Sequence, residues 1–279
     1  MRRAAADTMA APLAARATSD LLEGSTEAVA PPARAVAAGQ IPWSRSRERA
    51  HDQRGDRMKL LLTAAGIKNP SISDALVDLL GKPLAAASAR CIPTASYGHH
   101  GFAGAWRFLS GREPRRPMSE LGWQSLGVLE LTALPSLDEA HWVPLVKQTD
   151  VLLVTGGDAL YLCHWLRQSG LADLLPTLET VWVGLSAGSM VLTPRIGADF
   201  VTWQPPAGGD ETLGLVDFSI FPHLDHPDLP DNSLAGAERW AAAIAGPAYA
   251  IDDQTAIKVV DDTVEVVSEG HWQRFTPHP

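Results

Sequence analysis

One serine in this sequence stands where a strand is expected to turn sharply into a helix. Ser186 is the centre of residues 184–188, Gly-Leu-Ser-Ala-Gly, and the apolar run 181–183 before it is typical of a buried strand. A serine on such a turn presses the residues two before and two after it against neighbouring backbone, so only small residues fit there. The spacing therefore predicts an exposed, nucleophilic hydroxyl. A tight turn with an incidental serine is the plainer alternative.

A serine hydroxyl attacks only when a base takes its proton, and histidine is the usual base. Among the 9 histidines, His223 is the best candidate because it follows the apolar segment 218–222 and so lies at a strand end, where open α/β sheets build their sites. His226 is the competitor. The two imidazoles could also share a metal, but a catalytic zinc needs a third protein ligand and none has recognisable spacing. We expect no metal and no cofactor.

The base in turn needs a carboxylate that orients it, and a second strand end offers two. Asp252 and Asp253 directly follow the expected strand 248–251. Because adjacent residues of a strand point to opposite faces, only one of them is expected to reach His223. A pair of turn aspartates with no catalytic role is the alternative interpretation.

A second glycine turn is expected near the serine. The apolar strand before it ends in Gly156-Gly157-Asp158, where a helix begins. Glycine allows a close backbone approach, and N–H groups at a helix start suit an oxyanion, so Gly157 and Ala187 together could form a two-donor oxyanion hole. A phosphate-binding turn is the rival interpretation, but the spacing is not G-x-G-x-x-G and the carboxylate of Asp158 would repel phosphate.

Composition narrows the class of protein. A hydrophobic content of 46% is ample for a core, and no run approaches the roughly 18 apolar residues of a membrane span. The net charge of −9 argues against nucleic acid or an anionic membrane surface as a partner. Cys91 and Cys163 lie in apolar segments, and we interpret them as buried thiols of a cytoplasmic protein.

Residues 1–57 differ from the rest of the chain. They are rich in Ala, Arg, Pro and Ser and have no sustained apolar periodicity, which is typical of chain that cannot bury enough surface to fold. We predict a disordered tail or a misassigned start, with Met58 as the functional beginning. Residues 58–279 are predicted to form one α/β domain.

Within that domain, strand-like and helix-like segments alternate, which predicts a parallel sheet covered on both faces. The first helix is expected to be capped by Ser71 or Ser73, and the third by Ser136 or Asp138. The expected strands are 59–63, 89–94, 127–131, 150–155, 181–183, 214–221, 248–251, 255–260 and 263–268, the last two forming a hairpin, and the expected helices are 73–80, 103–109, 138–148, 159–168 and 234–245.

Four segments in this order resemble the peptidase E-like S51 family of serine peptidases, namely 152–162, 183–191, 215–226 and 249–260. The resemblance implies a flavodoxin-like fold, similar to class I glutamine amidotransferases: a three-layer α/β sandwich with a mainly parallel central sheet and a C-terminal β-hairpin. It also implies a Ser–His–acid triad, which falls on Ser186, His223 and Asp253, with Asp252 as the alternative acid.

The expected function is a serine exopeptidase, dipeptidase-like, that hydrolyses short peptides. An esterase or amidase acting on another small acyl substrate is the alternative, as is a non-catalytic protein that binds a small molecule on the same fold. An α/β-hydrolase is disfavoured because that fold orders its triad Ser, acid, His. We expect a small peptide substrate and neither nucleic acid nor membrane as partner, and a homodimer is left open.

Overall fold

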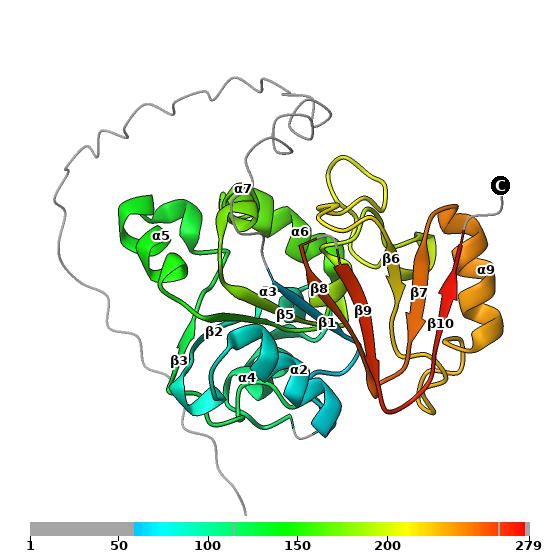
Figure 1. Ribbon diagram of the computed structural model, residues 1–279. Helices are drawn as coiled ribbons and strands as arrows, with labels where there is room; N and C mark the ends of the chain where they lie inside the picture. The colour runs from blue at the N-terminus through cyan, green and yellow to red at the C-terminus, as the bar shows by residue number, and fades with distance from the viewer. Residues whose placement is uncertain (1–58, 114, 262, 277–279) are drawn as a thin grey trace, which may run out of the picture. The chain divides into compact units, whose positions relative to one another are not determined.

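The computed structural model describes residues 59–113, 115–261 and 263–276, so the tail predicted for residues 1–57 lies outside the described residues (Figure 1). A seven-stranded sheet, here called the main sheet, runs through the middle in the order β3-β2-β4-β5-β1-β8-β9. The strands from β3 to β1 are parallel, and β8 and β9 are antiparallel. The strands are β1 (Leu60–Thr63), β2 (Ser88–Ile92), β3 (Ser125–Val128), β4 (Val151–Val154), β5 (Val181–Leu185), β8 (Thr255–Val260) and β9 (Thr263–Ser268).

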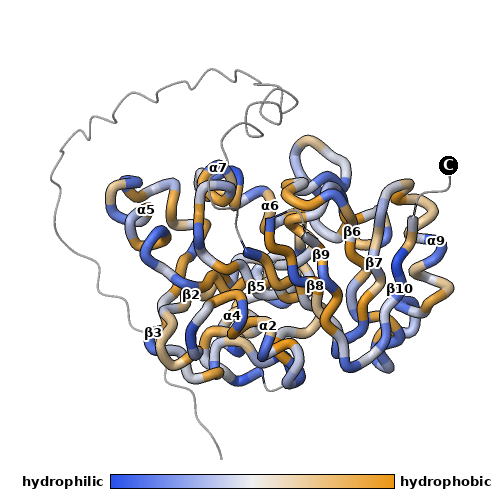
Figure 2. The backbone as a smooth tube through the Cα atoms, viewed as in Figure 1, coloured by the Kyte–Doolittle hydropathy of each residue, from blue (hydrophilic) through white to orange (hydrophobic). Residues whose placement is uncertain are grey.

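Helices cover both faces of the main sheet, which confirms the predicted three-layer sandwich. Leu61 and Val183 pack with α2 (Pro70–Leu80) and α4 (Gly101–Leu109) on one face. Leu62 and Trp182 face the other way, in a core shared with α5 (Glu139–Lys147), α6 (Ala159–Gln168), α7 (Leu171–Leu174) and α8 (Ala187–Met190). Figure 2 shows these central strands as largely hydrophobic stretches. Burial on both faces explains why they are continuously apolar rather than alternating.

A second sheet of three strands, here called the small sheet, has the order β10-β7-β6. Its strands are β6 (Ser219–Phe221), β7 (Ala248–Ile251) and β10 (Trp272–Phe275). Strands β6 and β7 run parallel, whereas β10 is antiparallel to β7. Helix α9 (Leu234–Ile244) covers this sheet through the buried Trp240 (Figure 1).

The strand predicted at 214–221 is too long. Only residues 219–221 pair in a sheet, because the N–H of Gly214 donates to Thr193 and that of Leu215 to Leu192, both in the segment after α8. Strand β10 was not predicted at all. Its four residues are mostly exposed and carry no apolar run.

Helix α2 begins earlier than predicted and its cap is a different residue. Asn69 Oδ1 accepts a hydrogen bond of 2.9 Å from the N–H of Ile72, and Pro70 occupies the first helical position. Proline is favoured there because its fixed φ suits the helix and its missing N–H costs nothing. Ser71 and Ser73 therefore lie inside the helix. Asp138 caps α5 as predicted, accepting from the N–H of Ala140 at 2.9 Å.

Both cysteines are buried, as predicted. Burial raises the pKa of Cys91 to about 12 and that of Cys163 to about 11, so neither thiol is ionised near neutral pH.

The helices that the described residues form are all too short or too polar to cross a lipid bilayer.

Candidate active site

Ser186 sits on a strained turn between β5 and α8. Its backbone dihedrals are φ 50° and ψ −109°, and its side chain is partly exposed. A Cβ added at Gly184 would lie 2.5 Å from the carbonyl oxygen of Gly188, and one added at Gly188 would lie 2.4 Å from that of Val154. Both contacts are too short for any side chain. The two glycines of the pentapeptide are therefore required by the close packing of this turn.

The end of β1 holds the turn in place. The N–H of Ser186 donates to the carbonyl of Thr63 at 2.9 Å, and Ser189 Oγ donates to the same oxygen at 2.8 Å. In return, Thr63 Oγ1 donates to the carbonyl of Gly184 at 2.8 Å. The sequence analysis did not single out Thr63. Its only signal is a polar residue at the end of an otherwise apolar strand.

The Gly156-Gly157-Asp158 turn lies directly beside the serine. A Cβ added at Gly156 would lie 3.3 Å from the Cβ of Ser186. Gly157 has a φ of 142°, and a Cβ there would lie 2.1 Å from the carbonyl oxygen of Ala95, so only glycine fits. The structure thus places Gly156, the residue before Gly157, beside Ser186, the residue before the first residue of α8, Ala187.

Asp158 is buried and caps α6. Its carboxylate accepts hydrogen bonds from the N–H of Tyr161 at 2.8 Å and of Trp203 at 2.7 Å, and from the hydroxyl of Thr202. The carboxylate therefore fixes the glycine turn to the segment that contains Thr202 and Trp203.

His223 and Asp253 come together at one edge of the small sheet. Because β6 and β7 are parallel neighbours, both end at the same edge, and each of these residues lies two positions beyond its strand. His223 Nδ1 and Asp253 Oδ1 are 2.7 Å apart, and His223 is buried. His226 lies near the same carboxylate, with its Nε2 at 3.7 Å from Asp253 Oδ2.

The electrostatics favour an ionised Asp253. Burial raises the pKa of this carboxyl, but the hydrogen bond with His223 and the electrostatic interactions with His223, His226 and Lys68 together hold it below its usual value. The carboxylate can therefore accept a hydrogen bond from the Nδ1–H group of His223 throughout the neutral range.

Asp252 has different neighbours from Asp253. Its carboxylate accepts hydrogen bonds from Thr255 Oγ1 at 2.6 Å, from the N–H of Gln254 at 3.0 Å and from the N–H of His271 at 2.8 Å. These contacts fix the turn between β7 and β8 and attach it to the segment before β10. The structure does not bring Asp252 to His223.

A third histidine, which the sequence analysis did not consider, links the two loops of the small sheet. His271 Nε2 lies 3.0 Å from Asp225 Oδ2, and its Nδ1 lies 3.1 Å from Asp252 Oδ2. No motif surrounds His271, because it precedes a strand that the sequence pattern did not predict.

The serine turn and the His223 strand belong to neighbouring elements, since α8 packs against β6. Backbone strain is concentrated here too. Among the described residues, the non-glycine residues with positive φ are Ser186, His223, Asp225, Ala245 and Asp261, so three of the five belong to this site. Such conformations cost free energy and cluster at functional sites.

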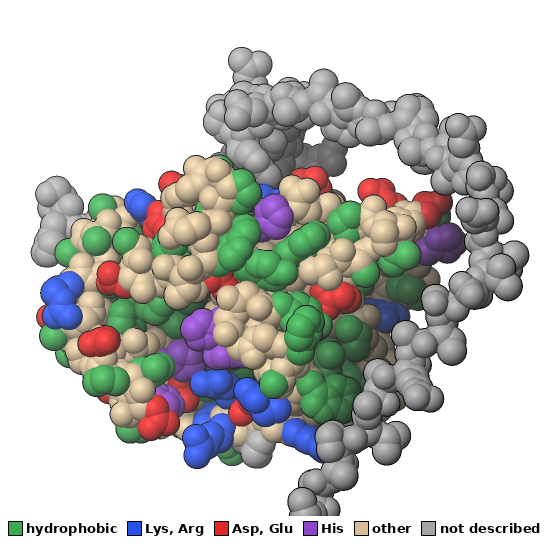
Figure 3. Space-filling view, turned by 180° about the vertical axis from the view of Figure 1, so that it is seen from behind, with side chains coloured by type: hydrophobic (Ala, Val, Ile, Leu, Met, Phe, Trp, Pro, Cys, Tyr) green, Lys and Arg blue, Asp and Glu red, His purple; other side chains and the backbone are tan. Residues whose placement is uncertain are grey.

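No part of the described chain brings together three or more His, Cys, Asp or Glu side chains in a way that could hold a metal ion. Charge on the surface is uneven, however. Figure 3 shows a face on which Lys and Arg side chains gather beside a group of His side chains, although the chain as a whole carries −9.

The fold and the serine turn together define an α/β protein of the serine-peptidase type. Residues 60–267 match the model of peptidase family S51, which is well over half of the sequence, and the chain belongs to that family.

Two curated relatives agree with this assignment. An uncharacterized peptidase of Listeria innocua is 30% identical over 123 residues, which cover 40% of this chain and 55% of that protein. Peptidase E of Nostoc sp. is 25% identical over 155 residues, covering 52% of this chain and 62% of the relative. The chain thus spans somewhat more than half the length of each.

Two solved structures share the fold. A candidate peptidase E protein from Listeria monocytogenes EGD-e superposes with a TM-score of 0.53 at 20% identity, covering 77% of this chain and 100% of that one. A peptidase from an acI-B1 Actinobacterium gives a TM-score of 0.56 at 19% identity, covering 82% and 98%. The predicted flavodoxin-like sandwich is confirmed.

Proposed function

We propose that this protein is a serine peptidase that hydrolyses short peptides as an exopeptidase, with Ser186, His223 and Asp253 as its triad. One observation carries the proposal. His223 Nδ1 is bonded to a carboxylate at 2.7 Å, at a strand end next to the element that begins at the strained serine. With the Nδ1 proton held by Asp253, the neutral imidazole has its lone pair on Nε2, which is the form that a general base requires.

The chemistry then follows the usual course of acyl transfer. Ser186 Oγ attacks the peptide carbonyl while its proton passes to His223 Nε2, and the imidazolium gives that proton to the leaving amine. Water next attacks the acyl-enzyme, with His223 again taking and returning a proton. The product is a free carboxylic acid and the regenerated serine. Asp253 stays ionised throughout and stabilises the imidazolium.

The oxyanion of the tetrahedral intermediate needs donors on the other side of the carbonyl. We assign the backbone N–H groups of Gly157 and Ala187 to this role. Ala187 is the first residue of α8, and the first N–H groups of a helix have no acceptor within the helix. Gly157 lies in the glycine turn beside the serine, and Gly156, directly before it, approaches Ser186. Two preorganised donors of this kind are typical of serine acyl transfer.

A fluorophosphonate probe tests the proposal directly, because it reacts with an activated serine and not with ordinary hydroxyls. We expect the wild-type protein to be labelled at Ser186 alone, and Ser186→Ala to remain unlabelled while unfolding at the same temperature. Ser136→Ala, the same change in an exposed turn, should be labelled like wild type. A wild-type protein that is not labelled, or a Ser186→Ala variant labelled as fast as wild type, would refute the proposed nucleophile.

Hydrolysis must accompany labelling. A panel of dipeptides, their N-acetylated forms and longer peptides should show cleavage of the short peptides with a free amino terminus and slow cleavage of the blocked or longer ones. Cleavage inside long chains would exclude an exopeptidase. Hydrolysis of simple esters with no peptide cleavage would favour the esterase alternative.

A further inference from the structure

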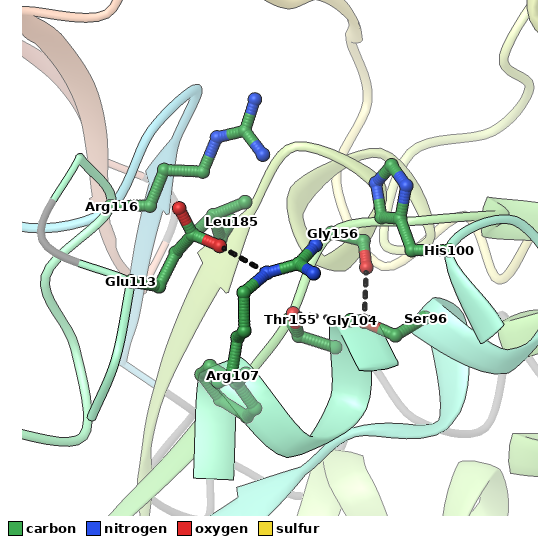
Figure 4. Close-up of a pocket in the computed structure, with 10 residues that line it drawn as sticks. Ser96, His100, Gly104, Arg107, Glu113, Arg116, Thr155, Gly156 and Leu185 are labelled. Atoms are coloured by element: carbon green, nitrogen blue, oxygen red, sulfur yellow. Dashed lines mark hydrogen bonds and ion pairs between the residues drawn. The ribbon is translucent and has the colours of Figure 1, made fainter. Parts of the chain in front are cut away.

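The serine side of the proposed site is fixed by close packing and hydrogen bonds within the main sheet. In Figure 4 the hydroxyl of Ser96 donates to the carbonyl of Gly156, at 3.1 Å, and so holds the glycine turn beside Ser186. The histidine side depends instead on the loop that follows β6. His223 and Asp225 in this loop have φ values of 59° and 53°. Non-glycine residues keep such conformations only where the surrounding structure holds them, so the contacts of this loop decide where the His223 imidazole lies.

The side chain of Asp225 anchors this loop at two points. Its Oδ1 accepts a hydrogen bond of 3.2 Å from the N–H of Leu234, the first residue of α9. Its Oδ2 lies 3.0 Å from His271 Nε2. An ionised carboxylate only accepts, so the imidazole of His271 is the donor of this second bond. His271 therefore holds the residue two positions after His223.

His271 is itself fixed to the turn that carries Asp253. Its N–H donates to Asp252 Oδ2 at 2.8 Å, its carbonyl accepts from the N–H of Asp252 at 3.3 Å, and its Nδ1 lies 3.1 Å from the same Oδ2. A Cβ added at Gly270 would lie 2.0 Å from that oxygen, so the glycine allows this close approach. Backbone and side-chain contacts together direct the ring toward Asp225.

His271 also lies where the chain crosses from one sheet to the other. It follows β9 of the main sheet and directly precedes β10 of the small sheet. The turn that contains Asp252 and Asp253 makes the opposite crossing, from β7 to β8. The bond from His271 to Asp225 thus ties both crossing segments to the loop that carries His223. It fixes the histidine side of the site relative to the sheet that carries the serine.

We propose that His271 is a positioning residue of the triad, which through Asp225 and Asp252 holds the imidazole of His223 within reach of Ser186. The inference rests on the proposed peptidase function and adds a residue to it. In this role His271 holds a neighbour of the base and takes no part in proton transfer. Displacing a catalytic group by about 1 Å can cost on the order of 10² in rate, so releasing the loop should slow the chemical step and leave substrate affinity nearly unchanged.

The rate at which a fluorophosphonate labels Ser186 tests this role without a known peptide substrate. His271→Asn and His271→Gln are a matched pair. The asparagine amide reaches about as far as Nδ1 and so keeps the contact with Asp252 alone, whereas the glutamine amide reaches about as far as Nε2 and can still donate to Asp225. We expect His271→Asn to be labelled about tenfold more slowly than wild type, and His271→Gln at least about threefold faster than His271→Asn. The two variants should unfold within a few degrees of each other.

His141→Asn is the control for the substitution itself. His141 is an exposed residue of α5, which covers the main sheet, so this variant should be labelled like wild type.

A change on the other side of the contact gives an independent test. Asp225→Gly removes the acceptor, and glycine suits the positive φ at this position. We expect it to slow labelling about as much as His271→Asn does. If the two residues act through one contact, adding His271→Asn to Asp225→Gly should slow labelling by less than about twofold more. Losses that multiply in the double variant would overturn the proposed contact.

Hydrolysis separates positioning from a general loss of structure. With any peptide that wild type cleaves, His271→Asn should lower kcat about tenfold and change KM less than about twofold. If His271→Asn is labelled as fast as wild type, or if His271→Gln is labelled as slowly as His271→Asn, this inference is wrong and the triad stands. Absence of labelling in wild type overturns the proposed function and this inference with it.

Discussion

The serine turn and the His223–Asp253 pair are built in different ways. The serine turn belongs to the main sheet and is fixed by steric contact, since the glycines on either side of Ser186 leave no room for a Cβ. His223 and Asp253 belong to the small sheet and are fixed by hydrogen bonds at two strand ends. The difference implies that substitutions of the two glycines should damage the fold, whereas substitutions of His223 or Asp253 should damage activity and leave the fold in place.

A large loss of activity that leaves the fold in place is expected at Asp253 in the second region, with the adjacent Asp252 as the comparison. Asp253→Asn should lower kcat/KM by on the order of 10³–10⁴, because an amide favours the wrong imidazole tautomer, and the melting temperature should change little. Asp252→Asn should lower kcat/KM less than about tenfold and destabilise the protein, because its carboxylate accepts hydrogen bonds from the neighbouring turn. Steady-state kinetics and thermal unfolding of both variants measure this. A larger loss of kcat/KM in Asp252→Asn than in Asp253→Asn would mean that Asp252 is the triad acid and Asp253 the structural residue.

The serine turn should show the opposite behaviour. Gly188→Ala places a methyl group 2.4 Å from the carbonyl oxygen of Val154, where backbone must move, and should reduce the free energy of unfolding by about 1–3 kcal/mol or more. Gly246→Ala is the matched control, because its nearest neighbours would be 3.8 Å away, and it should change stability by less than about 0.5 kcal/mol. Denaturant unfolding compares the two. Equal stabilities would mean that the glycine spacing does not constrain the turn.

The smallest predicted effect is the dependence of the free energy of unfolding on pH through Asp253. The pKa of Asp253 is held below its ordinary 3.8 in the folded state, so the unfolded chain takes up its proton first as pH falls. Its contribution to stability is therefore complete well above pH 3.8 and is lost as pH drops through the lower, folded pKa. For a partly exposed pair we expect less than about 1 kcal/mol. Unfolding free energies of wild type and Asp253→Asn should converge over this range, and a difference that grows on acidification would contradict the pairing.

Much of the main sheet could be predicted from the sequence because its signals are local. Strands β4 and β5 are continuous apolar runs next to glycine turns, and both were expected within two residues of their observed bounds. Only part of the small sheet could be predicted in this way: strand β7 was expected at its observed bounds, 248–251, but its neighbours were not. Strands β6 and β10 have three and four residues, and their pairing with β7 joins segments far apart in the chain.

The site residues also differ in how well local sequence signals predict them. The pattern 184–188 pointed to Ser186 because its spacing reflects a steric requirement that any such turn must meet. His223 and Asp253 carry no such pattern, and their neighbourhood depends on two parallel strands that the sequence alone did not pair.

The central claim is that a serine on one sheet and a histidine on the other form a single catalytic unit. Steady-state kcat for Ser186→Ala, His223→Ala and the double variant tests it most directly. Residues that act in the same step lose their joint contribution when either is removed, so each single variant should fall by on the order of 10⁶ and the double variant no further. Losses that multiply in the double variant, or a single variant that keeps a tenth of wild-type turnover, would contradict the account.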